Sequence, residues 1–160
     1  MKKLLSIAAA AILLFSACKK SDTAAPSTNA ESTWTLAGVT YKGTISYKAT
    51  TSGGDILANF WDGTPSATVK VNSLALSFKQ DPTTSGTYQL VGIGTTPAGK
   101  QFQLSAGTAA GAAYAYIGPA TVDVTVTVTN GKIKAVIPEV NMKSTTTAPD
   151  AKLSATVQEM

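Results

Sequence analysis

The stretch TVDVTVTVTNGKIKAVI, residues 121–137, decides the fold class. In residues 122–129 every even position is Val and every odd position is Thr or Asp. Strict alternation of β-branched residues indicates a strand with one buried side and one solvent-facing side. Asn130-Gly131 then predicts a two-residue type I′ hairpin turn, because both positions of that turn need a positive φ.

The hairpin also predicts a register that the residues themselves can test. A two-residue loop places Val128 opposite Ile133 and Val126 opposite Ala135, so apolar side chains meet apolar side chains on one face. In the second strand of this hairpin, the apolar positions are odd-numbered from Ile133 to Ile137 and even-numbered from Val140 onward. A phase change of one residue at a proline predicts a β-bulge or a strand end at Pro138.

From Trp34 onward the chain repeats this period of two in short segments separated by Gly, Asn, Asp and Pro, with no stretch of helical period. We expect a first hairpin formed by Thr35–Tyr41 and Thr44–Ala49 around Lys42-Gly43, and a further strand at Thr68–Val71. The pattern predicts an all-β domain, an antiparallel β-sandwich of about eight to ten short strands, with a lipocalin-like β-barrel as the alternative.

The N-terminal residues predict export and lipidation. Residues 1–3 are positively charged, residues 4–15 are almost wholly apolar, and small residues precede Cys18. This is the three-part pattern of a signal peptide, too short for a membrane span. Phe15-Ser16-Ala17-Cys18 resembles a bacterial lipobox, and the resemblance implies that Cys18 is acylated and begins the mature chain. The alternatives are an ordinary signal peptide ending near Ala17 and a lone core cysteine.

We therefore expect a signal peptide at residues 1–17, a lipidated cysteine with a disordered tether at residues 18–33, and one all-β domain at residues 34–160. The tether is polar, small and without hydrophobic period, and residues 19–33 span roughly 50 Å when fully extended. Lys19 stands where an Asp retains lipoproteins at the inner membrane in enteric-type sorting. The expected location is the cell envelope, at the outer membrane, with periplasmic and surface-facing orientations both open.

Composition excludes several functions. The chain has no His, which removes Ser-His-Asp triads, Cys-His dyads and histidine-based zinc or copper sites. All 13 basic residues are Lys, two of which leave with the signal peptide, so the formal charge of +4 falls by two units. A nucleic-acid partner is not expected, because such sites need a basic stripe with Arg. We predict no cofactor, no metal and no enzymatic activity.

Two groups of residues remain as site candidates. The acidic residues are scattered beside Gly, Pro and Ser, which is typical of turns, while calcium binding and carboxylate catalysis are alternatives. Exposed aromatic side chains stack on sugar rings, and the alternative is that they cap the core. The acidic candidates are Asp55, Asp62, Asp81, Asp123, Glu139, Asp150 and Glu159, and the candidate ligand-contact aromatics are Trp34, Trp61, Tyr114 and Tyr116.

Several segments carry a family resemblance. The lipobox, the polar tether, STWTLAGVTYKG (residues 32–43), SGTYQL (85–90) and VTVTNGKI (126–133) together resemble small Bacteroidota lipoproteins. The resemblance implies one all-β domain held to a membrane by its N-terminal lipid. Trp34 at the start of the first strand and Gly-x-Tyr in mid-chain also resemble lipocalin-like domains.

Three functions are compatible with the sequence. The first is a lipid-anchored envelope protein with a non-catalytic binding or interaction domain, whose partner is a glycan or a protein. The second is a lipocalin-like carrier of a small apolar ligand, which needs an interior cavity. The third is a glycoside hydrolase that uses two carboxylates across a groove.

Overall fold

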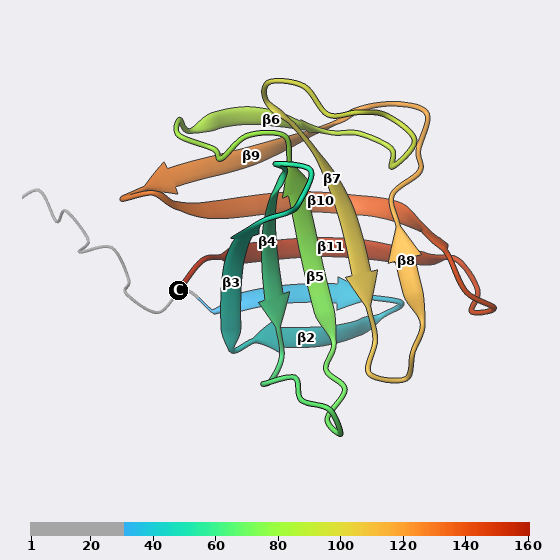
Figure 1. The fold of residues 1–160 in the computed structure, drawn as a ribbon. Coiled ribbons are helices and arrows are strands. Elements are labelled where there is room, and N and C mark those ends of the chain that lie inside the picture. Colours follow the sequence, from blue (N-terminus) through green and yellow to red (C-terminus); the bar gives the residue numbers. More distant parts are fainter. Residues whose placement is uncertain (1–30) are drawn as a thin grey trace, which may run out of the picture.

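The computed structural model describes residues 31–160, which contain eleven strands and no helix (Figure 1). The all-β prediction is confirmed. The predicted signal peptide, Cys18 and nearly all of the predicted tether lie outside the described residues. The strands are β1 (Ser32–Leu36), β2 (Val39–Gly43), β3 (Ile45–Thr50), β4 (Ile56–Trp61), β5 (Ser73–Phe78), β6 (Gly86–Leu90), β7 (Gln101–Gly107), β8 (Ala113–Ala115), β9 (Val122–Thr129), β10 (Lys132–Ser144) and β11 (Ala151–Gln158).

The hairpin predicted from residues 121–137 is present as β9 and β10. Val128 pairs with Ile133, and the turn residues Asn130 and Gly131 have φ values of 53° and 75°. The bulge predicted at Pro138 is also present, because the register of β10 against β11 shifts between Ile137 and Val140. A bulge keeps Pro138, which has no N–H, from breaking the strand.

The strands form one continuous sheet in the order β2-β1-β11-β10-β9-β6-β7-β5-β4-β3. β8 lies off this path and pairs with both β10 and β7, which closes the sheet. All ladders are antiparallel except that between β6 and β7. In Figure 1, β1, β2 and β9 to β11 run across the view, while β3, β4, β5 and β7 cross them steeply.

The barrel alternative therefore describes the fold, rather than a sandwich of two separate sheets. Two layers do face each other, as the sandwich prediction required, but β6 and β8 join them into one closed sheet. Alternation in the sequence shows which side chains point inward. It does not show whether the edge strands of two facing layers pair with each other, so the sequence left both architectures open.

The chain turns from one layer into the other at Gly43-Thr44, between β2 and β3. Gly43 pairs with Ser32 of β1, whereas the Thr44 N–H donates to the Trp61 carbonyl of β4 at 2.8 Å. A Cβ atom on Gly43 would lie 2.8 Å from the Ser32 Cβ. This glycine thus permits the close approach of two strands at a corner of the barrel.

Three sequence-based boundaries are corrected. The hairpin predicted around Lys42-Gly43 is wrong, because β2 pairs with β1 around Ala37-Gly38, whose φ values of 52° and 81° make the turn. A glycine that allows close approach and one that makes a turn look alike in sequence. The strand predicted at Thr68–Val71 is loop. β1 begins at Ser32, two residues before the predicted domain start at Trp34.

The inward-facing side chains of both layers fill the barrel. They form one cluster in which aromatic rings pack against aliphatic side chains, and Phe78 lies 5.1 Å from Phe102 between ring centroids. Most of these side chains are 0–2% exposed, so the barrel formed by residues 31–160 has no open calyx. The largest fully buried side chains are Trp34, Phe60, Phe78, Phe102, Leu36, Leu74, Leu76, Leu90, Leu104, Ile133, Met142 and Leu153.

One side of the barrel is held by side chains instead of a strand ladder. β3 pairs only with β4, and its inward-facing Lys48 reaches the far layer. The Lys48 Nζ lies 3.0 Å from the Asp81 Oδ1, 3.0 Å from the Gly131 carbonyl and 3.5 Å from the Glu159 Oε2. Glu159 is only 8% exposed and accepts the Ile133 N–H at 2.7 Å.

These contacts set the charge state of the lysine. Burial alone lowers the pKa of Lys48, but the hydrogen bond to Asp81 and the negative charges of Glu159 and Asp81 outweigh it, so the pKa is raised. A lysine whose folded pKa is raised stabilises the fold fully at neutral pH. That stabilisation is lost as the pH rises through the raised value, above 10.5.

Replacing Gly43 with Ala is expected to lower the free energy of unfolding by about 1–3 kcal/mol, because the new methyl group overpacks the corner against Ser32. Chemical denaturation measures the change. Gly94→Ala is the matched control, since no heavy atom lies within 4 Å of its Cβ position. Equal stability of the two variants would contradict the corner assignment.

Replacing Lys48 with Met is expected to cost about 1–3 kcal/mol, because the buried Glu159 carboxylate loses its cation. Glu159→Gln retains an acceptor for Ile133, so the double variant should lose less than the two single variants summed. The difference between wild type and Lys48→Met should shrink above pH 10.5. Strict additivity in denaturation experiments would show that the two residues are not coupled.

Candidate functional site

The structure separates the four aromatic residues that the sequence singled out. Trp34 is 1% exposed, and Tyr114 and Tyr116 are each 6% exposed. All three rings belong to the core cluster, which agrees with the alternative that they cap the core. Alternation in the sequence shows which residues of a strand share a side, and these three rings lie on the side that faces the barrel interior.

Trp61 lies on the outside of the barrel, as expected from its position next to Phe60, which is fully buried. Its ring stacks against that of Tyr47 on β3, with 6.1 Å between ring centroids and 17° between planes. Tyr47 is 54% exposed. Tyr47 does not stand out in the sequence, because its approach to Trp61 depends on the β3–β4 register, in which Ile45 pairs with Trp61.

We call the outward side of β3, β4, β5 and β7 the aromatic face. Its strands contribute no charged residue to this side, and the Asp55–Lys79 ion pair of 2.9 Å lies directly beyond its Ile56–Phe78 end. Its large side chains stand on β3 and β4, whereas β5 and β7 contribute mostly small ones. Trp61 pairs with Ser73, which pairs with Gly107, so the sheet surface next to the indole carries only small side chains; we call this surface the floor. The face consists of Ile45, Tyr47, Ala49, Leu57, Asn59, Trp61, Ser73, Ala75, Ser77, Gln103, Ser105 and Gly107.

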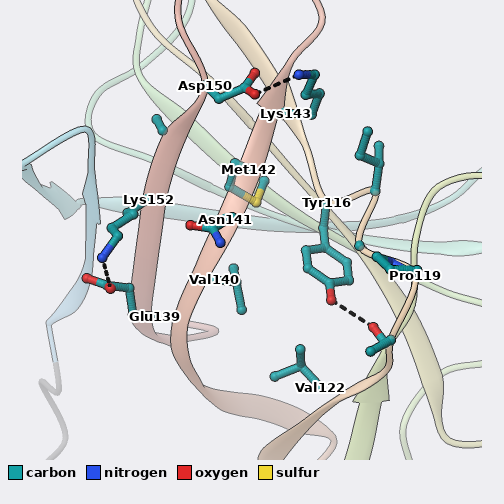
Figure 2. Close-up of a pocket in the computed structure, with 14 residues that line it drawn as sticks. Tyr116, Pro119, Val122, Glu139, Val140, Asn141, Met142, Lys143, Asp150 and Lys152 are labelled. Carbon is teal, nitrogen blue, oxygen red and sulfur yellow. Dashed lines mark hydrogen bonds and ion pairs between the residues drawn. The ribbon is translucent and has the colours of Figure 1, made fainter.

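A second feature is a surface cleft of about 780 Å³ between the β8–β9 connection and strands β10 and β11 (Figure 2). It exists because β10 pairs with β9 only as far as Val136 and with β8 only from Lys143. Between them, β10 has ladder partners on β11 alone. The Tyr116 hydroxyl donates to the Ala120 carbonyl at 2.7 Å and holds the opposite wall in place.

Two exposed ion pairs flank this cleft. Lys152 contacts Glu139 at 2.7 Å, and Lys143 contacts Asp150 at 2.7 Å (Figure 2). The hydrogen bond from Lys143, followed by that from the Ser144 N–H, lowers the pKa of Asp150. The hydrogen bond to Glu139 and its charge raise the pKa of Lys152. The lowered pKa favours the ionised form of Asp150, and both acids of the cleft are engaged by lysines, which favours a structural role over proton transfer.

Other acidic candidates also have local partners. Asp62 accepts the Asn72 N–H at 2.9 Å across the base of a loop, and Asp55 contacts Lys79 at 2.9 Å. These contacts agree with the turn interpretation of the sequence. Within residues 31–160, no group of three or more His, Cys, Asp or Glu residues is placed to hold a metal ion.

None of the described residues forms a helix long and apolar enough to cross a membrane. No family model, curated protein or solved structure matches this chain. The case for a function therefore rests on the geometry of its own surface, where the aromatic face and the cleft are the two candidates.

The placement of the two tryptophans predicts their fluorescence. Trp61→Phe leaves only the buried Trp34, so we expect a blue-shifted emission and reduced quenching by acrylamide. Trp34→Phe leaves the half-buried Trp61 and should give red-shifted, quenchable emission. Similar quenching of the two variants would contradict the outward position of Trp61.

Proposed function

We propose that this chain is a lipid-anchored protein of the bacterial cell envelope, at the outer membrane, whose barrel is a non-catalytic binding module. The lipobox at residues 15–18 supports the anchor, and its likeness to Bacteroidota lipoproteins supports the location. The aromatic face supports binding. A binding module uses exposed aromatic side chains as contact residues, and Tyr47 and Trp61 are placed for this role.

One observation carries the proposal: the aromatic pair lies outside a barrel whose interior is filled. A carrier of a small apolar ligand needs an enclosed hollow, but aromatic and aliphatic side chains occupy that space. The filled interior therefore favours a binding module over the carrier. The hydrolase alternative is weaker, because the two acids that line the cleft, Glu139 and Asp150, each pair with a lysine at 2.7 Å.

The position at which the chain enters β1 supports an accessible location for the aromatic face. Ser32 begins β1 and pairs with Gly43, and the next residue, Thr44, bonds to the Trp61 carbonyl. The segment that follows Cys18 thus joins the barrel at the end where Trp61 lies. In this proposal the small, polar residues 19–30 connect that end of the barrel to the lipid.

The anchor is tested by mass spectrometry of the native protein. The expected mature chain begins at Cys18 and carries the mass of two or three acyl chains, since one chain binds a membrane only reversibly. Cells grown with labelled palmitate should label the wild-type chain but not Cys18→Ser. A free thiol, or a mature chain that begins elsewhere, would contradict the anchor.

The binding role is tested by sedimentation of the purified full chain in detergent with insoluble envelope material from the same cells. Trp61→Ala and Tyr47→Ala are expected to weaken co-sedimentation about tenfold or more, as contact aromatics do. Val136→Ala is the matched control, because Val136 is 45% exposed on β10, outside the aromatic face. Equal sedimentation of all variants would remove the aromatic face as the binding site.

A further inference from the structure

We propose that the ligand of the aromatic face is a neutral saccharide; this inference rests on the proposed function and names the ligand class of the same site. Three properties of the face support it, namely an exposed aromatic pair, polar groups without internal partners, and the absence of charge. The aromatic pair supplies a stacking surface, and the other two properties each exclude a class of competing ligand.

The aromatic pair supplies a stacking surface. Sugar rings have faces of C–H groups that pack on aromatic rings, and a tyrosine or tryptophan offers such a surface at small cost in side-chain entropy. Tyr47 and Trp61 stack on each other at 6.1 Å, so each ring restrains the other. In the strand register Trp61 pairs with Ser73, which pairs with Gly107, so the positions next to the indole on β5 and β7 carry small residues.

The floor supplies hydrogen bonds. Within residues 31–160, the side chains of Asn59, Ser73 and Ser105 make no hydrogen bond to another residue, while their backbones are held in the ladders of β4, β5 and β7. Amides and hydroxyls both donate and accept, as sugar hydroxyls do. A saccharide that replaces water on these groups keeps them satisfied.

The lack of charge restricts the ligand further. The strands of the aromatic face contribute no Lys, and Lys79 at its edge is paired with Asp55 at 2.9 Å, so an anionic polysaccharide, a nucleic acid or an anionic lipid surface finds no unpaired counter-charge there. A purely apolar partner would bury the hydroxyls of Ser73, Ser77 and Ser105 without hydrogen bonds, which is costly. A neutral polyhydroxyl ligand fits both constraints.

The size of the face favours a chain of sugars. From β3 to β7 the face crosses three strand spacings, roughly 14 Å. One sugar ring beside Trp61 leaves the hydroxyl and amide groups of β5 and β7 uncovered. A short neutral oligosaccharide laid across the strands covers the aromatic pair and the polar floor together.

The test uses the purified full chain in detergent with xylan, mannan and amylose as neutral probes and polygalacturonate as the anionic probe. We expect at least one neutral polysaccharide to retard the wild-type protein in affinity electrophoresis. The same polysaccharide should change the tryptophan fluorescence of the wild type more than that of Trp61→Phe. Trp61→Ala and Tyr47→Ala should bind about tenfold more weakly or worse, while Val136→Ala binds as wild type.

Two further measurements separate the competing outcomes. Ser73→Leu raises the floor without removing an aromatic ring and should also weaken saccharide binding, with circular dichroism confirming the fold of each variant. In proteoliposomes with brominated phosphatidylcholine, Trp61 should not be quenched. Strong quenching there would identify a membrane-docking face and overturn the inference.

Failure of this inference can be told apart from failure of the proposed function. If Trp61→Ala weakens co-sedimentation with envelope material but no neutral polysaccharide binds the wild-type chain, the binding module stands and the saccharide assignment falls. If the neutral polysaccharides bind all variants equally, the saccharide site lies elsewhere and the assignment to the aromatic face is overturned.

Discussion

The close packing of two inward rows of side chains is the constraint on which this structure depends. Each strand gives alternate residues to the interior, and the two layers cross so that these residues form one cluster. Because that cluster fills the barrel, the binding role proposed above falls to the outer surface. The same alternation that builds the core also sets the outward residues in rows, which is how Tyr47 and Trp61 come to lie together.

The barrel is closed by backbone ladders on one side and by side-chain contacts on another. β6 and β8 close it with backbone ladders, whereas β3 relies on Lys48 and the partly buried charges around it. Backbone ladders tolerate changes of side chain, but a buried carboxylate depends on its cation. The two outer features follow from these closures, since the cleft lies where β10 has only one ladder partner and the aromatic face where the sheet is continuous.

The sequence predicted one hairpin and one bulge correctly, misplaced the first hairpin, and did not decide how the sheet closes. The hairpin at Asn130-Gly131 and the bulge at Pro138 follow from turn geometry and from proline chemistry, and both are present. The closure through β8 depends on contacts between segments far apart in the chain, which alternation does not encode. For the same reason the burial of Trp34 and the pairing of Tyr47 with Trp61 emerged only from the register.

The pairing of β1 with β11 has a consequence for how the molecule forms. The Ser32 hydroxyl donates to the Gln158 carbonyl across a sequence separation of 126 residues, and Lys48 reaches Glu159. Folds dominated by such non-local contacts have a high contact order and fold slowly, because loop-closure entropy is lost before the contacts form. An emerging chain cannot complete this barrel until β11 is available. For a protein exported as proposed above, slow closure would leave the domain to form only after the chain has crossed the inner membrane.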